Sequence, residues 1–388
     1  MVFARDSIEL ELDELKKNNL YRRPHTVEVF GAKVLVDGVK KIHLCSNDYL
    51  GLSRNPRVIE EAISTLDHIS QCSSRLVAGN SRKLLELEEQ IAKHRGTESS
   101  LVYPSGYMAN LGAITALAKK DTTIFSDELN HASIVDACRL SRATVKVFRH
   151  NDIECLSNLL QSTTSNKIVI TEGLFSMDGD FSALDQICRV VRDYKAIIIV
   201  DDAHGDFVFG SSGSYSGVPE YFDVKYMIDV NVSSLSKGLG CFGGYVASSK
   251  LVRELLVNKS RQFIYTSALP EHLCAAALAA VPVALNGNLQ RRLFRNVAFF
   301  HKKLKNLGFS IGRCTSQIMP VMLGDERLAV EFSNELSHNG VFVQPIRYPT
   351  VMKGKARLRV TITALHDKDD LQSAVDSFEM VGKKRNVI

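Results

Sequence analysis

Short apolar runs alternate with longer stretches of helical period through the middle of the chain. Runs such as "TTIFSD", "NKIVITEG" and "AIIIVDDAH" are rich in β-branched residues and end at polar residues or glycine, which is typical of buried strands. Stretches of helix length, such as "RKLLELEEQIAKHRG" and "NLGAITALAKK", lie between them. Strands that are apolar on both faces and alternate with helices form a mostly parallel sheet covered on both sides. Residues 49–272 are therefore predicted to form a large α/β domain.

The two ends of the chain follow other patterns. "SIELELDELKKNN" predicts an imperfect amphipathic helix and "VEVFGAKVLVDGVKKIHLCS" alternates like a small hairpin, so residues 1–48 are expected to form an N-terminal arm. After the helical stretch "EHLCAAALAAVPVALNG", the helices "RRLFRNVAFFHKKLKNLG" and "DERLAVEFSNELSHNG" are interleaved with the strand-like runs "QIMPVML", "VFVQPIRYP" and "ARLRVTITA". This mixture predicts a smaller C-terminal α+β domain over residues 273–388.

Composition narrows the classes of function. With 388 residues, of which 45% are apolar and 23% charged, the chain can bury a large core. The net charge of +5 is small and no basic run carries interleaved aromatic residues, so nucleic acid is not an expected partner, whereas anionic substrates are compatible. Eight cysteines lie between Cys45 and Cys314 without a C-x-x-C pair, which indicates reduced thiols and no metal site. The N-terminus has no apolar signal core, and no segment approaches the roughly 18 apolar residues of a membrane span, so a cytoplasmic protein is expected.

A lysine among small residues follows one predicted strand. Lys237 lies in "SLSKGLG", directly after the strand-like "MIDVNVSS". Asp201 and Asp202 end the run "AIIIVDDAH", with His204 close behind, and the 36 residues from Asp201 to Lys237 make about one helix-plus-strand crossover. By themselves, the aspartates would cap a helix and His204 would lie on the surface. Because ligands of open α/β sheets bind at the strand ends, a carboxylate and a lysine on adjacent ends predict a pyridoxal phosphate site. There the carboxylate keeps the pyridine nitrogen protonated and the lysine binds the aldehyde.

Two further segments fit that site. In "YPSGYMANLG" a strand end leads through Ser105 and Gly106 to a helix expected to start at Tyr107, where free backbone N–H groups suit a phosphate dianion. In "SDELNHASIVDA", His131 precedes a helix and can stack its imidazole on a pyridine ring. Taken alone, the first segment is an ordinary helix start and His131 is more often a packed or solvent-facing residue.

Three glycines close to Lys237 match the G-x-G-x-x-G pattern of dinucleotide-binding folds. They are Gly238, Gly240 and Gly243 in "GLGCFG". That pattern requires a helix to follow, because the helix N-terminus faces the pyrophosphate, whereas "GGYVASS" follows here and has the pattern of a strand. The glycines are therefore expected to let backbone pass close to a ligand beside Lys237, and a dehydrogenase ranks last among the possible functions.

Several motifs together resemble those of the α-oxoamine synthases, in the order in which that family has them. They are "CSNDYLGL", "SSRLVAGN" with "LELEEQIA", "PSGYMANLG", "NHASIVDA", "TEGLFSMDGD", "VDDAHG", "SLSKGLG", "YTSALP" and "ARLRVTITALH". The resemblance extends from about residue 8 to about residue 380. It implies a fold-type-I pyridoxal-phosphate enzyme, an obligate homodimer with shared active sites, which joins an amino acid to an acyl thioester and releases carbon dioxide.

The resemblance also implies a branch of the family. "PVMLGDERLA" and "IRYPTVMKGKARLRVTITALH" are most similar to the branch that condenses L-alanine with a pimeloyl thioester, on coenzyme A or a carrier protein, in biotin biosynthesis. The glycine C-acetyltransferases, and other members that use glycine or serine, share every cofactor residue and stay open as alternatives. A cofactor-binding subunit without catalytic activity also stays open, although the retention of Lys237 and Asp201 argues against it.

Each matching residue takes an implied role from the family. Lys237 matches the Schiff-base lysine, Asp201 the partner of the pyridine nitrogen, and His204 the residue near the cofactor's phenolic oxygen. The stacking ring is matched by His131. Further implied cofactor contacts are Ser105, Gly106, Tyr107, Ser176 and Ser234, with Thr266 and Ser267 reaching the phosphate from the other subunit. Implied substrate contacts are Asn47 and Arg359 near the amino acid's carboxylate, and Arg347, Thr350 and one of Arg22 or Arg23 along the acyl chain. An isolated Arg-Arg pair is otherwise the solvated end of a surface helix.

The chain departs from the family pattern at three places. Cys72 and Arg82 stand in a loop where glycines and a histidine or threonine are usual. Asp206 and Phe207 replace the usual small residues after the histidine and are expected beside the pocket. Tyr348 stands where the closest relatives have proline, as in the glycine acyltransferases. These departures bear on the loop geometry and on the acyl specificity.

Overall fold

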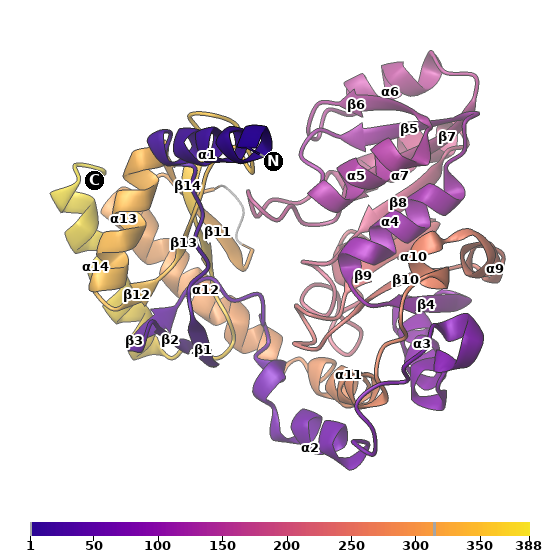
Figure 1. Cartoon of the computed structure of the whole chain (residues 1–388), viewed down its shortest axis with the longest axis horizontal. Helices are drawn as coiled ribbons and strands as arrows, with labels where there is room; N and C mark the ends of the chain where they lie inside the picture. The colour runs from indigo at the N-terminus through magenta and orange to yellow at the C-terminus, as the bar shows by residue number, and fades with distance from the viewer. Residues whose placement is uncertain (1, 313–315) are drawn as a thin grey trace. The chain divides into compact units, whose positions relative to one another are not determined.

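A computed structural model of the chain describes residues 2–312 and 316–388 (Figure 1). Two compact units can be distinguished. The central unit comprises Asn47–Ser176 and Phe181–Arg291, and the terminal unit comprises the described residues of Met1–Ser46, Met177–Asp180 and Arg292–Ile388.

The chain forms helices and strands in close alternation. The helices are α1 (Val2–Lys17), α2 (Pro56–Ser64), α3 (Arg82–Arg95), α4 (Gly106–Leu117), α5 (Ala132–Ser141), α6 (Ile153–Gln161), α7 (Leu184–Asp193), α8 (Gly217–Tyr221), α9 (Lys250–Lys259), α10 (Arg261–Ile264), α11 (Glu271–Ala284), α12 (Asn288–Leu307), α13 (Glu326–His338) and α14 (Lys368–Lys384). The strands are β1 (Val27–Phe30), β2 (Lys33–Val36), β3 (Val39–His43), β4 (Ser99–Tyr103), β5 (Thr122–Asp127), β6 (Thr144–Phe148), β7 (Asn166–Glu172), β8 (Ile197–Asp201), β9 (Val230–Ser234), β10 (Gly244–Ser248), β11 (Ile318–Gly324), β12 (Val341–Phe342), β13 (Gln344–Ile346) and β14 (Ala356–Thr361).

The central unit is built on a seven-stranded sheet in the order β4-β10-β9-β8-β7-β5-β6 (Figure 1). The five strands from β9 to β6 run parallel, and β10 lies antiparallel between β4 and β9. This arrangement confirms the predicted fold class, a mostly parallel α/β sheet of the fold-type-I kind. It also confirms that a strand follows the glycines of "GLGCFG", so that this segment lacks the helix of a dinucleotide-binding turn.

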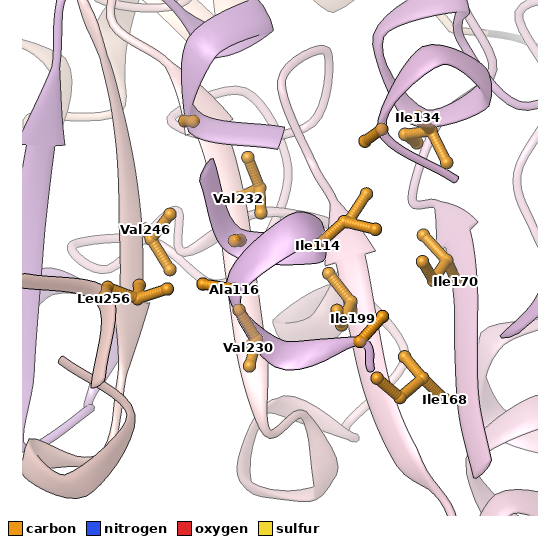
Figure 2. Close-up of a cluster of buried hydrophobic side chains, with 14 of the residues drawn as sticks. Ile114, Ala116, Ile134, Ile168, Ile170, Ile199, Val230, Val232, Val246 and Leu256 are labelled. Carbon is orange, nitrogen blue, oxygen red and sulfur yellow. The ribbon is translucent and has the colours of Figure 1, made fainter. Parts of the chain in front are cut away.

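The apolar core lies on one face of this sheet, under α4 and α5 (Figure 2). Successive strand residues point to opposite faces, so every second residue of a strand joins the core. The core row comprises Ile168 and Ile170 of β7, Ile199 of β8, Val230 and Val232 of β9, and Val246 of β10. By the same alternation, Glu172, Asp201 and Ser234 continue this row at the carboxyl ends of β7, β8 and β9. The fold thus brings three polar side chains to one edge, just above an apolar layer.

Helices α4 and α5 begin at this edge because polar side chains cap them. The hydroxyl of Ser105 accepts from the N–H of Met108 at 3.2 Å, and Nδ1 of His131 accepts from the N–H of Ser133 at 3.2 Å. The predicted start of α4 at Tyr107 is therefore one residue late, because the cap at Ser105 places Gly106 in the first turn.

The terminal unit contains two small sheets. In the first, β1, β2 and β3 form an antiparallel meander, and β12 joins β3 as a parallel neighbour. In the second, β14 lies antiparallel between β11 and β13. The contacts therefore group the predicted N-terminal arm with the C-terminal domain.

The predicted domain limits at residues 48 and 272 stay a prediction, and the two units divide the chain elsewhere. The units change at residues 46 and 47 and again at 291 and 292. The second difference has a physical cause, because α11 packs on α2 and α3 and so belongs to the central unit. The sequence pattern around α11 gives no sign of this packing partner.

Some features bear on chemistry and location. No single helix of the described chain has the length and apolar composition of a membrane span, and one bent pair, α11 with α12, meets those criteria only when its helices are taken together. Within residues 2–312 and 316–388, no group of three or more histidine, cysteine or acidic side chains is arranged to hold a metal ion. Seven cysteines are free thiols, and Cys314 lies outside the described residues.

Candidate active site

Lys237 lies in the tight turn that follows β9. Its Nζ is 2.9 Å from Nε2 of His204, in the loop that follows β8. Since β8 and β9 are parallel neighbours, the two side chains meet at one sheet edge, as their spacing in the sequence predicts. A Cβ at Gly238 would lie only 2.4 Å from the carbonyl oxygen of Asp206. Glycine is therefore needed beside the lysine, because any larger residue would push its turn away from the loop after β8.

A chain of hydrogen bonds extends from Lys237 through His204 to two residues at the start of the central unit. Nδ1 of His204 lies 2.5 Å from the hydroxyl of Tyr49, which donates to Oδ1 of Asn47 at 3.2 Å. Both ring nitrogens of His204 therefore face a hydrogen-bond partner, Tyr49 at Nδ1 and Lys237 at Nε2. Tyr49 is completely buried and His204 is 6% exposed, so this chain fixes the orientation of the imidazole ring.

Asp201 ends β8 on the face of the sheet that α4 covers. Its Oδ2 accepts from Nδ2 of Asn110 at 2.6 Å, and its Oδ1 accepts from the N–H of Ala203 at 3.0 Å. The Asn110 amide also donates to the hydroxyl of Ser133 at 2.9 Å, and that hydroxyl lies 2.8 Å from Nδ1 of His131. Asp201 and His131 are thus connected through α4 and α5. Among the described residues, no ion pair involves Asp201.

The start of α4 forms a cradle with the end of β9. A Cβ at Gly106 would lie 3.2 Å from the Cβ of Ser234, and a Cβ at Gly244 would lie 2.3 Å from the backbone nitrogen of Gly106. The hydroxyls of Ser234 and Ser236 are 2.8 Å apart at this point. Backbone N–H groups at a helix N-terminus, together with hydroxyls, bind phosphate well. The cradle therefore suits a phosphate group.

Two exposed rings border the same edge. His131 lies edge-to-face with Tyr107, with ring centroids 6.3 Å apart and an interplanar angle of 79°. The hydroxyl of Tyr107 donates to Oδ2 of Asp136, and this bond raises the pKa of the phenol. His131 keeps its ring accessible and can cover a flat ligand from one side.

Glu172 is a further acidic residue at this edge, and the sequence analysis gives it no role. It ends β7 in register with Asp201 and is only 3% exposed. Burial, and then the charge of Asp201, raises the pKa of Glu172 well above its usual range, although Lys237 acts in the opposite direction. Its Oε1 has no hydrogen-bond partner within the described part of the chain.

The other predicted cofactor residues of the central unit lie at different depths. Ser176 is buried, Thr266 is half-buried and Ser267 is exposed. Ser267 forms an isolated antiparallel bridge with Ser74, in the loop before the short π-helical turn Arg75–Gly79. The roles of these three residues stay predictions.

The predicted acyl-chain residues gather in the terminal unit. Arg22 donates to the hydroxyl of Thr350 at 3.3 Å, and Arg347 donates to the backbone carbonyl of Asn19. They line a cavity of about 630 Å³ whose charged lining is entirely basic: Lys16, Arg22, Arg23 and Arg347, with His25 beside them. Burial, and then the charge of Arg22, lowers the pKa of Arg347.

Arg359 and Tyr348 belong to the same unit. Arg359 lies on β14, is 8% exposed and donates to the hydroxyl of Thr361 at 3.4 Å. The Tyr348 side chain is 41% exposed. The predicted contact of Arg359 with a substrate carboxylate stays a prediction.

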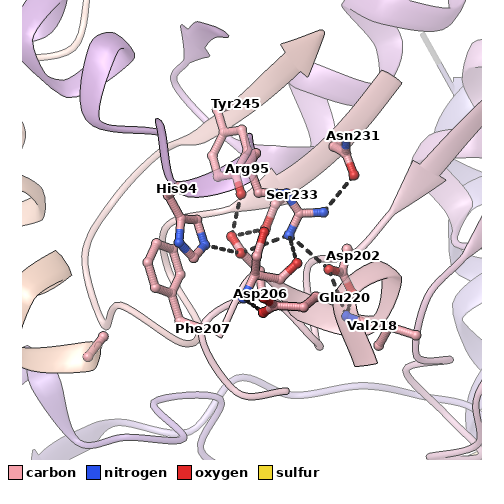
Figure 3. A network of polar contacts seen from close by, with 12 residues as sticks. His94, Arg95, Asp202, Asp206, Phe207, Val218, Glu220, Asn231, Ser233 and Tyr245 are labelled. Carbon is pink, nitrogen blue, oxygen red and sulfur yellow. Dashed lines mark hydrogen bonds and ion pairs between the residues drawn. The ribbon is translucent and has the colours of Figure 1, made fainter. Parts of the chain in front are cut away.

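A buried ionic network lies on the opposite face of the central sheet (Figure 3). Arg95 of α3 donates to Oδ2 of Asp202 and to Oδ1 of Asp206, each at 3.0 Å, and to Oδ1 of Asn231 at 2.6 Å. Asp206 also binds His94 at 2.9 Å, and the hydroxyls of Ser233 and Tyr245 donate to its Oδ2. These contacts lower the pKa of Asp206 to about 2 against the effect of burial, whereas burial raises the pKa of Asp202 to about 7.

The network includes two residues that depart from the family pattern. The Asp206 side chain is 1% exposed and bonded within the network, and Phe207 stacks on His94 with ring centroids 4.0 Å apart. The backbone carbonyl of Asp206 lies against Gly238, next to Lys237, and the place of Asp206 and Phe207 beside the pocket stays a prediction. Phe207 takes a φ of +61°, which favours glycine, as does exposed Cys72 with a φ of +50°. At Cys72 and at Phe207 the backbone therefore has a conformation typical of glycine, although the residue carries a larger side chain.

Sequence reasoning missed four residues of this site, and all four stand in motifs that it quoted. They are Tyr49 in "CSNDYLGL", Asn110 in "PSGYMANLG", Ser133 in "NHASIVDA" and Glu172 in "TEGLFSMDGD". The signal that could have found them was position. Glu172 ends a strand, and Ser133 and Asn110 lie in the first turns of helices at the same edge.

Residues 39–378 match the aminotransferase class I and II family. The chain belongs to this family. It is 42% identical to an 8-amino-7-oxononanoate synthase of Thermoanaerobacter pseudethanolicus, over 99% of this chain and 98% of the relative, and 41% identical to that of Geobacter sulfurreducens, over 98% and 99%. These likenesses confirm the resemblance to the α-oxoamine synthases.

Solved structures agree with this placement. A serine palmitoyltransferase of S. paucimobilis has a TM-score of 0.94 and 29% identity, with complete coverage of both chains. An 8-amino-7-oxononanoate synthase of Francisella tularensis has a TM-score of 0.75 and 27% identity, covering 90% of this chain and 99% of that chain. By backbone likeness the chain is more similar to the serine palmitoyltransferase, whereas by sequence identity it is more similar to the 8-amino-7-oxononanoate synthase of Thermoanaerobacter pseudethanolicus.

Proposed function

We propose that this protein is an 8-amino-7-oxononanoate synthase, which condenses L-alanine with a pimeloyl thioester in biotin biosynthesis. In the overall reaction a bond forms between the α-carbon of alanine and the acyl carbon, the carrier thiol leaves the thioester, and the alanine carboxyl leaves as carbon dioxide. The observation that carries this conclusion is identity above 40% to curated synthases along almost the whole of both chains.

Pyridoxal 5′-phosphate is the cofactor, and the described residues fit it. The cradle at Gly106 and Ser234 would hold the phosphate, Asp201 the ring nitrogen and His131 one face of the ring. Lys237 would bind the aldehyde, with His204 near the phenolic oxygen. The bound cofactor supplies an electron sink for the α-carbon of the amino acid. These assignments are supported by one structural fact: the residues lie on neighbouring strand ends and helix starts of one unit.

Lys237 and His204 carry the proton transfers in this proposal. Lys237 is half-buried, and its amine takes the α-proton of alanine and later returns a proton to the product. Nε2 of His204 is hydrogen-bonded to Lys237 and Nδ1 to Tyr49, so the ring is held against the lysine. Asp201 holds the ring proton of the cofactor, because a carboxylate without an ion-pair partner in the described chain is free to form a charge-assisted bond.

The basic cavity of the terminal unit favours an acyl chain that ends in a carboxylate. Arg22 and Arg347 repel each other, and none of the described residues that line their cavity is acidic. An arginine pair of this kind is stabilised when an anion binds between its members, whereas a plain alkyl chain would gain nothing from it. This argument supports a pimeloyl chain over the palmitoyl chain that the name of the S. paucimobilis relative implies.

A homodimer in the cytoplasm remains part of the proposal. Thr266 and Ser267 are proposed to reach the phosphate of the partner subunit. Large apolar side chains close to Ser267 in the chain or through its bridge to Ser74 are exposed, with Tyr265 at 72% and Val77 at 81%. Exposed apolar groups of this size are typical of an interface with a second protein.

The decisive experiment is product analysis with a matrix of substrates. Alanine, glycine and serine are each combined with pimeloyl, acetyl and palmitoyl thioesters of coenzyme A, and pimeloyl is also offered on a carrier protein. The expected product, identified by mass, is 8-amino-7-oxononanoate from alanine and a pimeloyl donor. If glycine with the acetyl thioester turns over best, the protein is a glycine C-acetyltransferase; if serine with palmitoyl does, it is a serine palmitoyltransferase.

The same matrix tests the basic cavity. Arg22→Ala and Arg347→Ala should weaken the preference for pimeloyl over acetyl by roughly 10- to 150-fold, the worth of a charge-assisted contact of about 1.5–3 kcal/mol. Arg23→Ala is the matched control, because the Arg23 guanidinium lies over the ring of Tyr21, 5.6 Å from its centroid, in a cation–π contact. An equal effect of all three substitutions would assign the acyl end to the whole basic surface and not to the Arg22 and Arg347 pair.

A further inference from the structure

We propose that Glu172 is a positioning residue that acts as a neutral carboxylic acid beside Asp201, so that the negative charge of this part of the site stays on Asp201. This inference rests on the proposed function, in which Asp201 holds the ring nitrogen of the cofactor. It concerns a buried acidic side chain that the proposed proton transfers do not use.

The position of Glu172 follows from the sheet. Ile168 and Ile170 of β7 pack in the apolar core (Figure 2). Glu172 occupies the next alternate position of β7 and is therefore the last member of the same row. It is paired in register with Asp201, and paired residues of parallel strands project to the same face. The two carboxyl groups therefore stand side by side above an apolar layer.

Charged groups face Glu172 from each neighbouring element. Asp127 at the end of β5 and Asp201 at the end of β8 repel a negative charge on it, and Lys237 after β9 attracts one. The backbone N–H of His131, before α5, donates to the Glu172 carboxyl group. Lys237 also lies against His204 at 2.9 Å. Burial and two carboxylates thus favour the neutral acid, whereas Lys237 and the His131 N–H favour the ionised form.

Another buried glutamate of the same unit shows what an ionised carboxylate requires here. Glu88 is 4% exposed, and its two oxygens contact Arg75 and, at 3.2 Å, Arg253. It also accepts from the N–H of Val102 at 2.8 Å. Within the described residues, Glu172 takes part in no such ion pair, and its Oε1 is without a hydrogen-bond partner. Two arginines therefore contact Glu88, whereas no described cation forms an ion pair with Glu172.

The hydrogen-bond inventory points the same way. Two buried acceptor oxygens near Asp201, Oε1 of Glu172 and Oδ1 of Asn110, have no donor within the described chain. A proton on Glu172 changes one acceptor of this crowded group into a donor. The neutral acid also keeps its contact with the His131 backbone, which positions the ring that covers the cofactor.

The first test uses the protein without cofactor, so that it does not depend on activity. Urea unfolding of wild type and Glu172→Gln is followed from about pH 5 to about pH 8. A carboxyl whose pKa is raised in the folded state binds a proton that the unfolded chain, with its usual value near 4.5, has released. Wild type should therefore lose stability relative to Glu172→Gln as pH rises from about 5, its unfolding constant growing by up to about tenfold per pH unit while the folded carboxyl keeps its proton.

Two further variants complete this test. Glu88→Gln is the matched control, since it removes a carboxylate that arginines neutralise. It should be less stable than wild type, but its curve of stability against pH should stay parallel to the wild-type curve. Asp201→Asn should reduce the trend of Glu172, because it removes one of the two repelling charges. Parallel curves for wild type and Glu172→Gln across the range would overturn the proposal.

The second test reads the cofactor directly. In the loaded protein, the pH titration of the cofactor absorbance band should keep its midpoint in Glu172→Gln, because glutamine imitates a neutral acid. An ionised Glu172 would instead make this substitution remove a nearby charge and shift the midpoint by about one unit or more. Glu172→Ala should lower cofactor affinity, since it leaves the His131 N–H without its acceptor. If wild type shows no cofactor band, the proposed function fails, while the unfolding curves still decide the state of Glu172.

Discussion

Two buried polar clusters lie back to back on the central sheet and are built in opposite ways. On the α3 face, Arg95 joins Asp202 and Asp206, and every carboxylate oxygen of the two aspartates has a donor (Figure 3). On the α4 face, Asp201 and Glu172 stand together without an ion-pair partner among the described residues. The first cluster is internally balanced, and the second is not.

The difference separates what holds this fold from what does its chemistry. A buried carboxylate is stable when cations and donors surround it, and such a group has nothing left to offer a ligand. In the cluster around Asp201, the charge of Asp201 has no ion-pair partner and Oε1 of Glu172 has no donor among the described residues. Such groups lower the stability of the fold, but they can bind a ligand. Asp201 and Asp202 are neighbours in the chain, yet one serves each cluster, because successive residues at a strand end face opposite sides of the sheet.

The largest effect on activity is expected from Lys237→Ala. Turnover should be abolished, since the substitution removes the amine that lies 2.9 Å from Nε2 of His204 and that carries the proton transfers of the proposed reaction. Some cofactor should remain bound, because the cradle of Gly106 and Ser234 does not depend on the lysine. The measurements are product formation, absorbance and thermal unfolding, with Lys120→Ala, an exposed position, as control. Reduction of the loaded enzyme with borohydride should label Lys237, and a label on a different lysine would contradict the assignment.

The next largest effect should come from the balanced network. Arg95→Met removes its cation and leaves Asp206 buried without its strongest partner, which should cost about 3–5 kcal/mol of unfolding free energy. Arg189→Met is the control, because the Arg189 side chain is 75% exposed in its ion pair with Asp185, and it should leave stability close to wild type. Urea unfolding measures both. A stable Arg95→Met protein without activity would mean that the network serves the site and not the fold.

The sharpest comparison uses the two adjacent aspartates. Asp201→Asn should lower turnover strongly while the protein stays folded, because the amide cannot hold the ring proton of the cofactor. Asp202→Asn should keep most activity, since burial raises the pKa of Asp202 to about 7 and an amide resembles its protonated form. Raising the pH from about 4 to about 7 should cost wild type some stability, because the folded carboxyl keeps a proton that the unfolded chain has already released, and Asp202→Asn should not share this loss. Near-normal turnover in Asp201→Asn together with a strong loss in Asp202→Asn would make Asp202 the better candidate for the ring nitrogen.

The sequence carried much of the fold and the outline of the site. Strand ends are visible as apolar runs closed by polar residues, so the meeting of Lys237, Asp201 and His204 at one edge could be predicted from spacing alone. Tyr49 could not be placed against His204, because 155 residues separate them and only the folded sheet brings them together.

The ionic network was hidden for a different reason. His94 and Arg95 end a charged helix whose sequence, "IAKHRG", has the composition of a solvated end. They are buried because α3 packs against β4 and β10, a contact that no local pattern records. Glu172 escaped notice in the same way, since acidic residues are seldom found in a core row.

The pairing of β3 with β12 determines when the first sheet of the terminal unit can be completed during translation. The two strands are separated by about 300 residues, and ribosomes add about 5–20 residues per second, so β3 waits on the order of 15–60 s for its parallel neighbour. During that interval the strands β1 to β3 can pair only with one another, while apolar residues such as Val29 and Phe30, exposed even in the finished protein, face the cell. The terminal unit is thus the last to close, and the central unit, whose sheet is completed by β10 and whose last residue is Arg291, can fold while residues 292–388 are still being made.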